Sequence, residues 1–314
     1  MVHAITSIIE PIGESYIFYY KNCSYINDYY KYILNIIKNI IIVNDLKINI
    51  IFGHTSYDKN VVFKNNNKIL VLLLNVEHTF LKKNFKKYKN NIHVKTNLKD
   101  IYGNYYYSGF IKNLEETFKD EKTNIVIDYS KSNIDNLSNY KQFNYIKNKH
   151  IHIASSLFSD YFIKENRKND IITTFFRPNS TKKRINLLET IENKMVSHKN
   201  FTQVWGTKLK ELYKNSKILI NIHQYEDLDT FEELRALPAL QCGVIVISEH
   251  SPLKESISYH NSIIWTSYEN IVDKSIEVLE KYDYYHSKIF TKDLKLNFDL
   301  ENYNALSKKI IEHL

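Results

Sequence analysis

The stretch SKILINIHQYEDLDTFEELRALPALQCGVIVISE, residues 216–249, carries the signals of a strand–helix–strand unit, the clearest indication of fold class in the chain. Residues 217–222 form a short apolar run between polar residues, as expected for a buried strand of a parallel sheet. Residues 244–247 are β-branched throughout and predict a second strand. A helix between two such strands is the repeating unit of α/β proteins.

The helix of this unit has signals at both ends. Thr230 and Glu233 have the spacing of a capping box, which predicts a helix that begins at Thr230. Gly243 stands where a left-handed residue commonly ends a helix. The polar loop HQYEDLDT, residues 223–230, follows the carboxyl end of the first strand, where open α/β sheets bind ligands.

The same alternation of strands and helices extends outward over most of the chain. Strands are predicted at residues 15–20, at a sheet edge, and at 47–52, 68–76, 124–127, 149–153, 171–176, 200–205 and 262–265. Helices are predicted at residues 29–42, 130–140, 182–196, 207–215, 252–258, 268–281 and, as one or two, within 287–314. This pattern is typical of an α/β protein with parallel sheets covered on both faces.

Length and composition predict two domains. The chain has 314 residues, of which 43% are hydrophobic, so each of two domains can bury a core. The predicted domains are residues 1–160 and residues 161–285. Residues 286–314 are expected to form C-terminal helices, and one alternative is that these helices pack back on the first domain.

The net charge of +8 permits binding to nucleic acid, to anionic membranes or to phosphorylated small molecules. The lysines are scattered, with the densest run at residues 82–90, and no arginine-rich arm is present. A solvated lysine-rich surface is therefore favoured over a nucleic-acid site.

Targeting signals are not evident in the sequence. The first ten residues lack a basic start and a long apolar core, and no apolar run reaches the roughly 18 residues of a membrane span. The two cysteines, Cys23 and Cys242, predict neither a disulfide framework nor a metal site. A cytoplasmic protein is expected, in the host cytoplasm if the chain is viral.

Four segments carry a resemblance to a known family. They are VWG (204–206), LYKNSKILINIH (212–223), TFEELR (230–235) and ALQCGVIVISE (239–249). Together they resemble the nucleotide-binding half of group 1 glycosyltransferases of the GT-B fold, of the small bacterial or viral type. VLLLNVEHTF (71–80) and VIDYSKSNIDNL (126–137) extend the resemblance more weakly to the first half.

The resemblance implies two Rossmann-like domains facing a cleft. A nucleotide diphosphate sugar would bind the second domain as the donor substrate, and a hydroxyl acceptor (a glycan, a lipid-linked or a protein acceptor) would enter from the first. It also implies a hexosyltransferase-like enzyme that needs neither a metal ion nor a cofactor. The alternative is a protein on the same scaffold that binds nucleotide sugars or glycans without catalysis.

The resemblance places donor-binding residues on the second domain. Glu232 would hold sugar or ribose hydroxyls, and Arg235 would contact phosphate or fix that glutamate; the alternative is an ion pair within the helix. His223 would bond the donor or else hold the loop backbone. Thr230 and Gly206 complete this set.

Basic residues follow the first strand of the second domain. Arg177 and Asn179, at the strand end, are assigned to the donor diphosphate. For each of residues 182–184 (Lys-Lys-Arg), an exposed first turn of a helix is favoured over such a role.

In the first domain, His54 and Glu77 follow predicted strands and are the candidates for a general base. Asp128 and Ser130 are assigned to strand-end and helix-cap chemistry. His150 and His152 would share a strand face, but two imidazoles without a third ligand are a weak metal site.

Pro238 departs from the pattern of the family. Many retaining members carry a second glutamate five residues before the glycine, and here that position is Pro238. The usual turn glycine near Arg177 is also missing. These departures leave the stereochemistry open and motivate the non-catalytic alternative.

Overall fold

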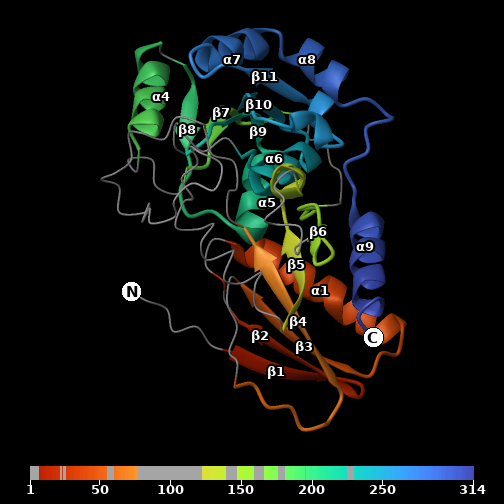
Figure 1. Cartoon of the computed structure of the whole chain (residues 1–314). Coiled ribbons are helices and arrows are strands. Elements are labelled where there is room, and N and C mark those ends of the chain that lie inside the picture. Colours follow the sequence, from red (N-terminus) through yellow and green to blue (C-terminus); the bar gives the residue numbers. More distant parts are fainter. Residues whose placement is uncertain are drawn as a thin grey trace, which may run out of the picture. The chain divides into compact units, whose positions relative to one another are not determined.

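The computed structural model describes residues 7–21, 23, 26–54, 60–76, 122–138, 147–158, 166–175, 181–194, 196–224 and 230–314. The chain divides into two compact units (Figure 1). Unit 1 comprises Met1–Ala154 with Asp299–Leu314, and unit 2 comprises Ser155–Phe298. The boundary therefore falls at Ala154 rather than at residue 160, and residues 286–298 belong to unit 2.

Within its described residues, unit 1 contains a six-stranded sheet of order β1-β2-β3-β4-β5-β6. Strands β2 to β6 are parallel, and β1 pairs with β2 in the antiparallel direction. The elements are β1 (Ser7–Ile12), β2 (Ser15–Tyr20), α1 (Asn27–Val43), β3 (Ile48–His54), β4 (Lys68–Asn75), β5 (Thr123–Asp128), α3 (Lys131–Ser138), β6 (His150–His152) and α9 (Asp299–Ile311).

The two faces of this sheet are covered differently. On one face, the Tyr30 ring of α1 stacks on Phe52 with ring centroids 4.3 Å apart, and the Tyr30 hydroxyl donates to the Phe52 carbonyl at 2.7 Å. On the other face, Phe18, Ile51, Val71 and Leu73 form a buried cluster. The alternation of Ile51 and Phe52 between the faces follows from the two-residue period of a strand.

The C-terminal helix α9 packs against α1. Its Asn302 side chain bonds both main-chain groups of Ala154, accepting from the N–H at 3.0 Å and donating to the carbonyl at 2.8 Å. The Tyr32 hydroxyl donates to Asp299 at 2.8 Å. These bonds make α9 part of unit 1 although it follows unit 2 in the sequence.

The described part of unit 2 contains a five-stranded parallel sheet of order β11-β10-β9-β7-β8. Its elements are β7 (Asn169–Thr173), α4 (Lys182–Asn193), β8 (His198–Asn200), α5 (Gly206–Lys214), β9 (Ser216–Asn221), α6 (Glu233–Gln241), β10 (Ile245–Glu249), η4 (Lys254–Ser256), η5 (His260–Ser262), β11 (Ile263–Thr266), α7 (Ile271–Glu280) and α8 (Tyr282–Ile289).

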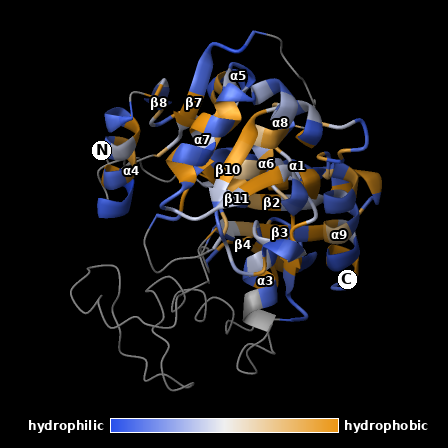
Figure 2. Cartoon of the chain, turned by 90° about the horizontal axis from the view of Figure 1, so that it is seen from above, coloured by the Kyte–Doolittle hydropathy of each residue, from blue (hydrophilic) through white to orange (hydrophobic). Residues whose placement is uncertain are grey.

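Unit 2 is a three-layer α/β structure. Helices α7 and α8 pack on one face of the sheet and α5 and α6 on the other (Figure 1). Strand β10, next to the central strand β9, is buried along its whole length and is coloured mostly hydrophobic in Figure 2, whereas α4 carries many hydrophilic residues. The predicted α/β class with parallel sheets is confirmed.

Helix α6 ends as predicted but begins differently. Gly243 has φ of +72°, and the N–H groups of Gly243 and Val244 donate to the carbonyls of Leu240 and Ala239 at 2.8 and 3.0 Å. This is a Schellman motif, so the predicted stop at Gly243 is confirmed. The predicted capping box is wrong, because the N-cap is Glu232 and Glu233 is the first helical residue.

Two predicted strands need correction. Residues 15–20 are not an edge strand, because β2 lies between β3 and a further strand, β1, which turns back through Gly13 with φ of +58°. The strand predicted at residues 200–205 is also wrong. Strand β8 ends at Asn200, and Gln203 has φ of +56°, which is incompatible with an extended strand.

Candidate functional site

The strand order of unit 2 reverses between β7 and β9. The chain runs from β7 outward to the edge strand β8 and then returns to the other side of β7 to form β9. Open parallel sheets bind ligands outside the carboxyl ends of the two strands at such a reversal. In unit 1 the described strands follow chain order, so this rule selects the carboxyl ends of β7 and β9 in unit 2.

Two guanidinium groups lie against Phe175, which follows β7 and is fully buried. Cζ of Arg184 is 4.7 Å from the centroid of the Phe175 ring, and Cζ of Arg235 is 6.0 Å from it. Nη1 of Arg235 donates to Oδ1 of Asn221, the last residue of β9, at 2.7 Å. Because Asn221 is neutral, this bond fixes the guanidinium of Arg235 without cancelling its charge.

The start of α4 brings further charge to the same end of the sheet. Lys183 Nζ lies 2.6 Å from Oε1 of Glu249, the last residue of β10, and both residues are buried. Thr181 caps α4 by accepting a bond from the Arg184 N–H at 3.3 Å. Lys182 is exposed, but the exposed helical turn favoured for residues 182–184 is wrong for Lys183 and Arg184, which are 7% and 5% exposed.

His223 is part of this network through its main chain and its ring. Its N–H donates to Oε2 of Glu249 at 3.2 Å, and its Nε2 lies 2.9 Å from the carbonyl oxygen of His250. Glu249 thus links Lys183 to the backbone after β9. These contacts match the loop-holding alternative for His223, whose ring contacts the main chain just after β10.

The hydrogen bond between Arg235 and Asn221 connects the first turn of α6 to the end of β9. Thr230 is buried, and Glu232 is half-buried at the N-cap position. Glu233 is fully buried, and its Oε2 accepts a hydrogen bond from the Tyr259 hydroxyl at 3.0 Å. Pro238 lies inside α6 and is buried, so this helix offers no carboxylate at that position.

The remaining predicted donor-side residues are placed less completely. Gly206 is the first residue of α5 and has φ of +59°, a conformation that favours glycine. Arg177 and Asn179 lie outside the described residues, as does the candidate base Glu77. Among the described candidates, the structure brings Arg235 and His223 to the end of β9 and Glu232 and Thr230 to the start of α6.

The other candidate base, His54, ends β3 in unit 1. Burial lowers the pKa of His54 to about 4, so its ring is neutral at pH 7. Its Nε2 is buried and has no hydrogen-bond partner within the described part of the chain. A base with this pKa accepts a proton poorly at neutral pH unless a ligand changes its surroundings.

The low pKa of His54 predicts a pH-dependent stability. As the pH falls below 6.5, His54 in the unfolded chain takes up a proton, whereas folded His54 stays neutral until about pH 4. Protonation therefore favours the unfolded state, so the stability contribution is full above pH 6.5 and is lost as the pH decreases. Between pH 7 and pH 4.5 the contribution lost is roughly 2–3 kcal/mol. Urea unfolding of the wild type and of His54→Gln at both pH values measures this difference, and an identical pH dependence in the two proteins would contradict it.

A polar cluster around Asp128 in unit 1 is held together by hydrogen bonds among its own members. Asp128 is fully buried and accepts hydrogen bonds from the Asn75 amide at 2.6 Å, the Ser130 N–H at 2.9 Å and the Asn133 amide at 3.2 Å. Nε2 of His150 lies 3.0 Å from the same carboxylate. The predicted strand-end and cap roles of Asp128 and Ser130 are confirmed.

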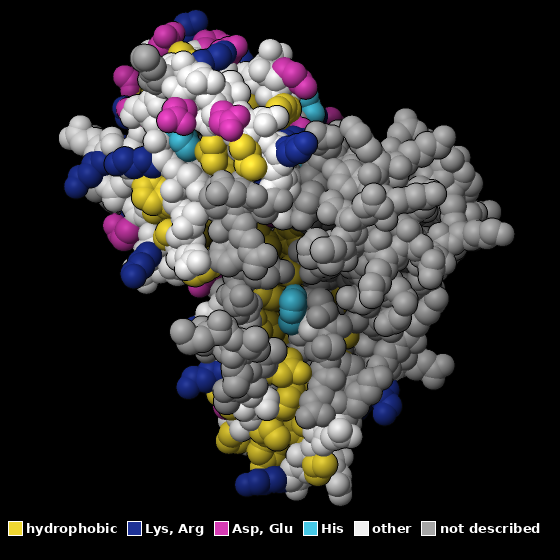
Figure 3. Space-filling model, turned by 90° about the vertical axis from the view of Figure 1, so that its left-hand side faces the viewer, with side chains coloured by type: hydrophobic (Ala, Val, Ile, Leu, Met, Phe, Trp, Pro, Cys, Tyr) yellow, Lys and Arg dark blue, Asp and Glu magenta, His cyan; other side chains and the backbone are white. Residues whose placement is uncertain are grey.

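His150 and His152 do not form one donor set, because His152 Nε2 lies 3.2 Å from the Tyr129 carbonyl oxygen instead. More widely, no group of three or more His, Cys, Asp or Glu side chains in the described residues is placed to hold a metal ion. No helix in the same part of the chain is long and apolar enough to cross a membrane. On the face shown in Figure 3, basic and acidic side chains are interspersed rather than sorted into one basic stripe.

Comparison of the sequence with known proteins identifies one similar protein. The chain is 34% identical over 173 residues to an uncharacterized protein, R358, of Acanthamoeba polyphaga mimivirus. The match covers 52% of this chain and 56% of that protein, so it spans little more than half of the relative. No protein-family model matches the chain.

Solved structures of similar fold are also known. A candidate UDP-N-acetylglucosamine 2-epimerase from Listeria monocytogenes is 12% identical, with 91% of this chain and 80% of that chain covered and a TM-score of 0.42. An α-glucosyltransferase in complex with UDP-glucose and DNA containing an abasic site is 11% identical, with 87% and 79% covered and a TM-score of 0.39. The wall teichoic acid polymerase TagF is 9% identical, with 90% and 86% covered and a TM-score of 0.37. At these values the likeness says nothing about substrate or reaction.

Sequence reasoning missed the members of the site that depend on distant partners. Glu249, Asn221 and Phe175 were not candidates, and each touches a basic residue from another element. Their common signal is position, since Asn221 and Glu249 end β9 and β10 and Phe175 follows β7. Polar residues that end buried parallel strands would have been found by that criterion alone.

Proposed function

We propose that the chain is a glycosyltransferase that transfers a sugar from a nucleotide diphosphate sugar to a hydroxyl acceptor. The observation that carries the proposal is the pair of guanidinium groups, Arg184 and Arg235, held against Phe175 at the strand-order reversal of unit 2. An anion bound beside this ring would be attracted by both guanidinium groups. A diphosphate suits this arrangement because guanidinium groups bind phosphate oxygens with two parallel hydrogen bonds.

In this proposal the basic residues act on the leaving group. When the bond between the sugar and the diphosphate breaks, negative charge develops on the departing phosphate oxygen. Arg235, fixed by Asn221, would stabilise that charge without having to reorganise during the reaction. Glu232, at the start of α6, would bond the hydroxyl groups of the donor.

The proton of the acceptor hydroxyl needs a base if the reaction inverts configuration. His54 and Glu77 stay the candidates in unit 1. A neutral His54 is in the correct protonation state for a base, although its pKa of about 4 makes it a weak one.

A thermal-shift screen tests the proposal. UDP, GDP, ADP and their glucose conjugates are each added in excess to the full chain, and one of the series is expected to raise the melting temperature. A ligand at one hundred times its dissociation constant stabilises a protein by about 2.7 kcal/mol. Absence of any shift across the whole series would sink the proposal.

Pro238 favours a second candidate, a protein that binds nucleotide sugars without transferring them. The buried proline stands in α6 where the family pattern has a glutamate, so one polar contact to the donor is missing. Binding of a donor with neither hydrolysis nor transfer across a panel of glycan, lipid-linked and protein acceptors would favour this candidate. Release of nucleoside diphosphate that depends on an acceptor would exclude it.

A further inference from the structure

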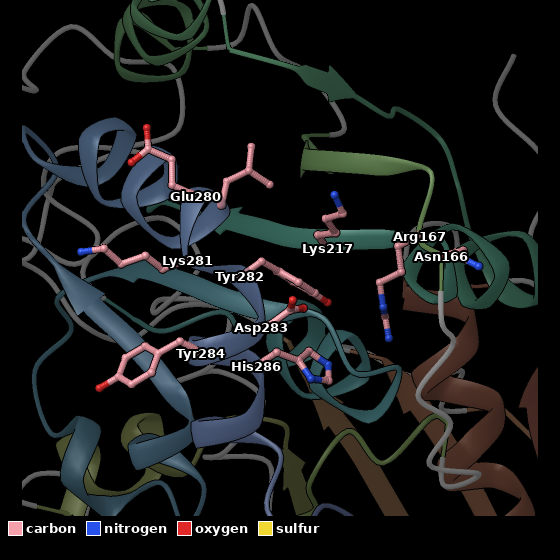
Figure 4. Close-up of a pocket in the computed structure, with 10 residues that line it drawn as sticks. Asn166, Arg167, Lys217, Glu280, Lys281, Tyr282, Asp283, Tyr284 and His286 are labelled. Carbon is pink, nitrogen blue, oxygen red and sulfur yellow. The ribbon is translucent and has the colours of Figure 1, made fainter.

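A cavity of about 760 Å³ opens at the amino edge of the unit 2 sheet, the opposite edge from the candidate donor site. It lies between the residues that lead into β7, the start of β9 and the junction of α7 with α8 (Figure 4). Its volume falls within the range of small-molecule sites in proteins. The lining residues are Asn166, Arg167, Lys217, Leu279, Glu280, Lys281, Tyr282, Asp283, Tyr284 and His286.

Two buried polar atoms of this cavity lack a hydrogen-bond partner among the described residues. They are the hydroxyl oxygen of Tyr282 and Nε2 of His286. The two residues lie one turn apart on α8, and their ring centroids are 5.3 Å apart. Buried polar atoms in native proteins nearly always find a partner, so these two atoms mark a place where a bound molecule would supply one.

Positive charge faces the same two atoms. The guanidinium of Arg167 is fixed by bonds to the carbonyls of Tyr213, Ser216 and Cys242 at 3.1, 2.7 and 2.7 Å. Burial raises the pKa of Tyr282 and lowers that of His286, and the charge of Arg167 lowers both. Figure 4 shows Tyr282 extending from the start of α8 toward Arg167, with His286 on the same side.

Lys217 adds a second positive group on the sheet side of the cavity. Its Nζ is 5.8 Å from the centroid of the Tyr282 ring and is paired with Asp170 at 2.7 Å. Glu280 and Asp283 also line the cavity, so positive charge is confined to one part of the lining and negative charge is present elsewhere. A molecule with one anionic end and a neutral body rich in hydroxyl groups matches this distribution better than a polyanion does.

We propose that this cavity binds a small organic anion, bearing a phosphate or a carboxylate and about the size of a sugar phosphate. The anionic group would take the hydrogen bond of the Tyr282 hydroxyl beside Arg167, and hydroxyl groups of the ligand would bond His286 and the acidic side chains. The proposal does not depend on the function proposed for the opposite edge of the sheet.

Isothermal titration calorimetry of the full chain at pH 7 tests this site with four probes. Glucose 6-phosphate, gluconate, inorganic phosphate and glucose are titrated separately. Glucose 6-phosphate or gluconate is expected to bind, which also separates a phosphate ligand from a carboxylate ligand. Failure of both to bind at millimolar concentration would overturn the proposal, as would binding of glucose or inorganic phosphate with equal affinity.

Variants locate the binding. Tyr282→Phe removes only the hydroxyl group. It is expected to lower the affinity for whichever probe binds by at least tenfold. Tyr285→Phe, on the same helix but outside the cavity lining and with its hydroxyl bonded to Glu277 at 2.6 Å, is the matched control and should leave the affinity unchanged. Arg235→Gln, at the other edge, should also have no effect. An unchanged affinity in Tyr282→Phe would overturn the assignment to this cavity.

Discussion

Arg235→Gln is expected to weaken the binding of a nucleoside diphosphate by about tenfold to one hundredfold, because charged hydrogen bonds contribute about 1.5–3 kcal/mol each. The loss in the rate of sugar transfer should be larger, about 100- to 1,000-fold, as for other groups that stabilise developing charge. The reason lies in the geometry, since Arg235 is held by the neutral Asn221 and keeps its charge at the strand-order reversal. Calorimetric titration and a single-turnover transfer assay measure the two effects.

Three further variants make this result specific. Lys292→Gln removes a positive charge from an exposed position of unit 2 and should leave both quantities unchanged. Arg235→Lys keeps the charge but loses the planar fork, so an intermediate effect is expected. Asn221→Ala should weaken nucleotide binding less than Arg235→Gln does. In this variant the Arg235 guanidinium loses the hydrogen bond that orients it, but the positive charge is still present. Arg235→Gln with wild-type affinity and a wild-type circular dichroism spectrum would contradict the assignment of the donor site.

Lys183→Ala is expected to destabilise the protein by about 3–5 kcal/mol, because it leaves the Glu249 carboxylate buried without its ion-pair partner. A loss of this size is a large part of the stability of an ordinary domain. Urea unfolding at pH 7 measures it. The matched control is Lys182→Ala, one residue away on the exposed surface of α4, which should change stability by less than about 0.5 kcal/mol.

The double variant Lys183→Met with Glu249→Gln separates the charge from the packing. Removing both charges together avoids an uncompensated buried ion, so the double variant should be much more stable than Lys183→Ala. A loss below about 1 kcal/mol in Lys183→Ala would show that the pair contributes little to folding. Equal losses in the single and double variants would assign the effect to packing alone.

Elements of unit 2 were predicted well where the signal, such as an apolar run or a helix-ending glycine, lies within the element itself. Residues 217–222 and 244–247 predicted β9 and β10 to within two residues, and Gly243 predicted the end of α6. The beginning of α6 was misplaced at Thr230 because a capping-box spacing is short and frequent. Glu233 is instead buried and bonded to Tyr259, a partner 26 positions away that no local pattern reveals.

The candidate site was harder to predict for the same reason. Arg235 stood out by its position on a helix after a strand-end loop, but its partners Asn221 and Phe175 come from two other elements. The burial of Lys183 depends on Glu249, which lies 66 positions further along the chain. Only the pairing of Lys183 with Glu249 in the folded unit distinguishes Lys183 from its exposed neighbour Lys182.

Hydrogen exchange with and without a nucleoside diphosphate tests whether the carboxyl ends of β7 and β9 bind the donor. The nucleotide that stabilises the protein in the thermal screen is added in saturating amount, and amide exchange is followed by mass spectrometry. Protection is expected in peptides that cover residues 219–224 and 230–236, with none at residues 279–286. Unchanged exchange at the first two segments, or protection confined to the third, would contradict donor binding at the ends of β7 and β9.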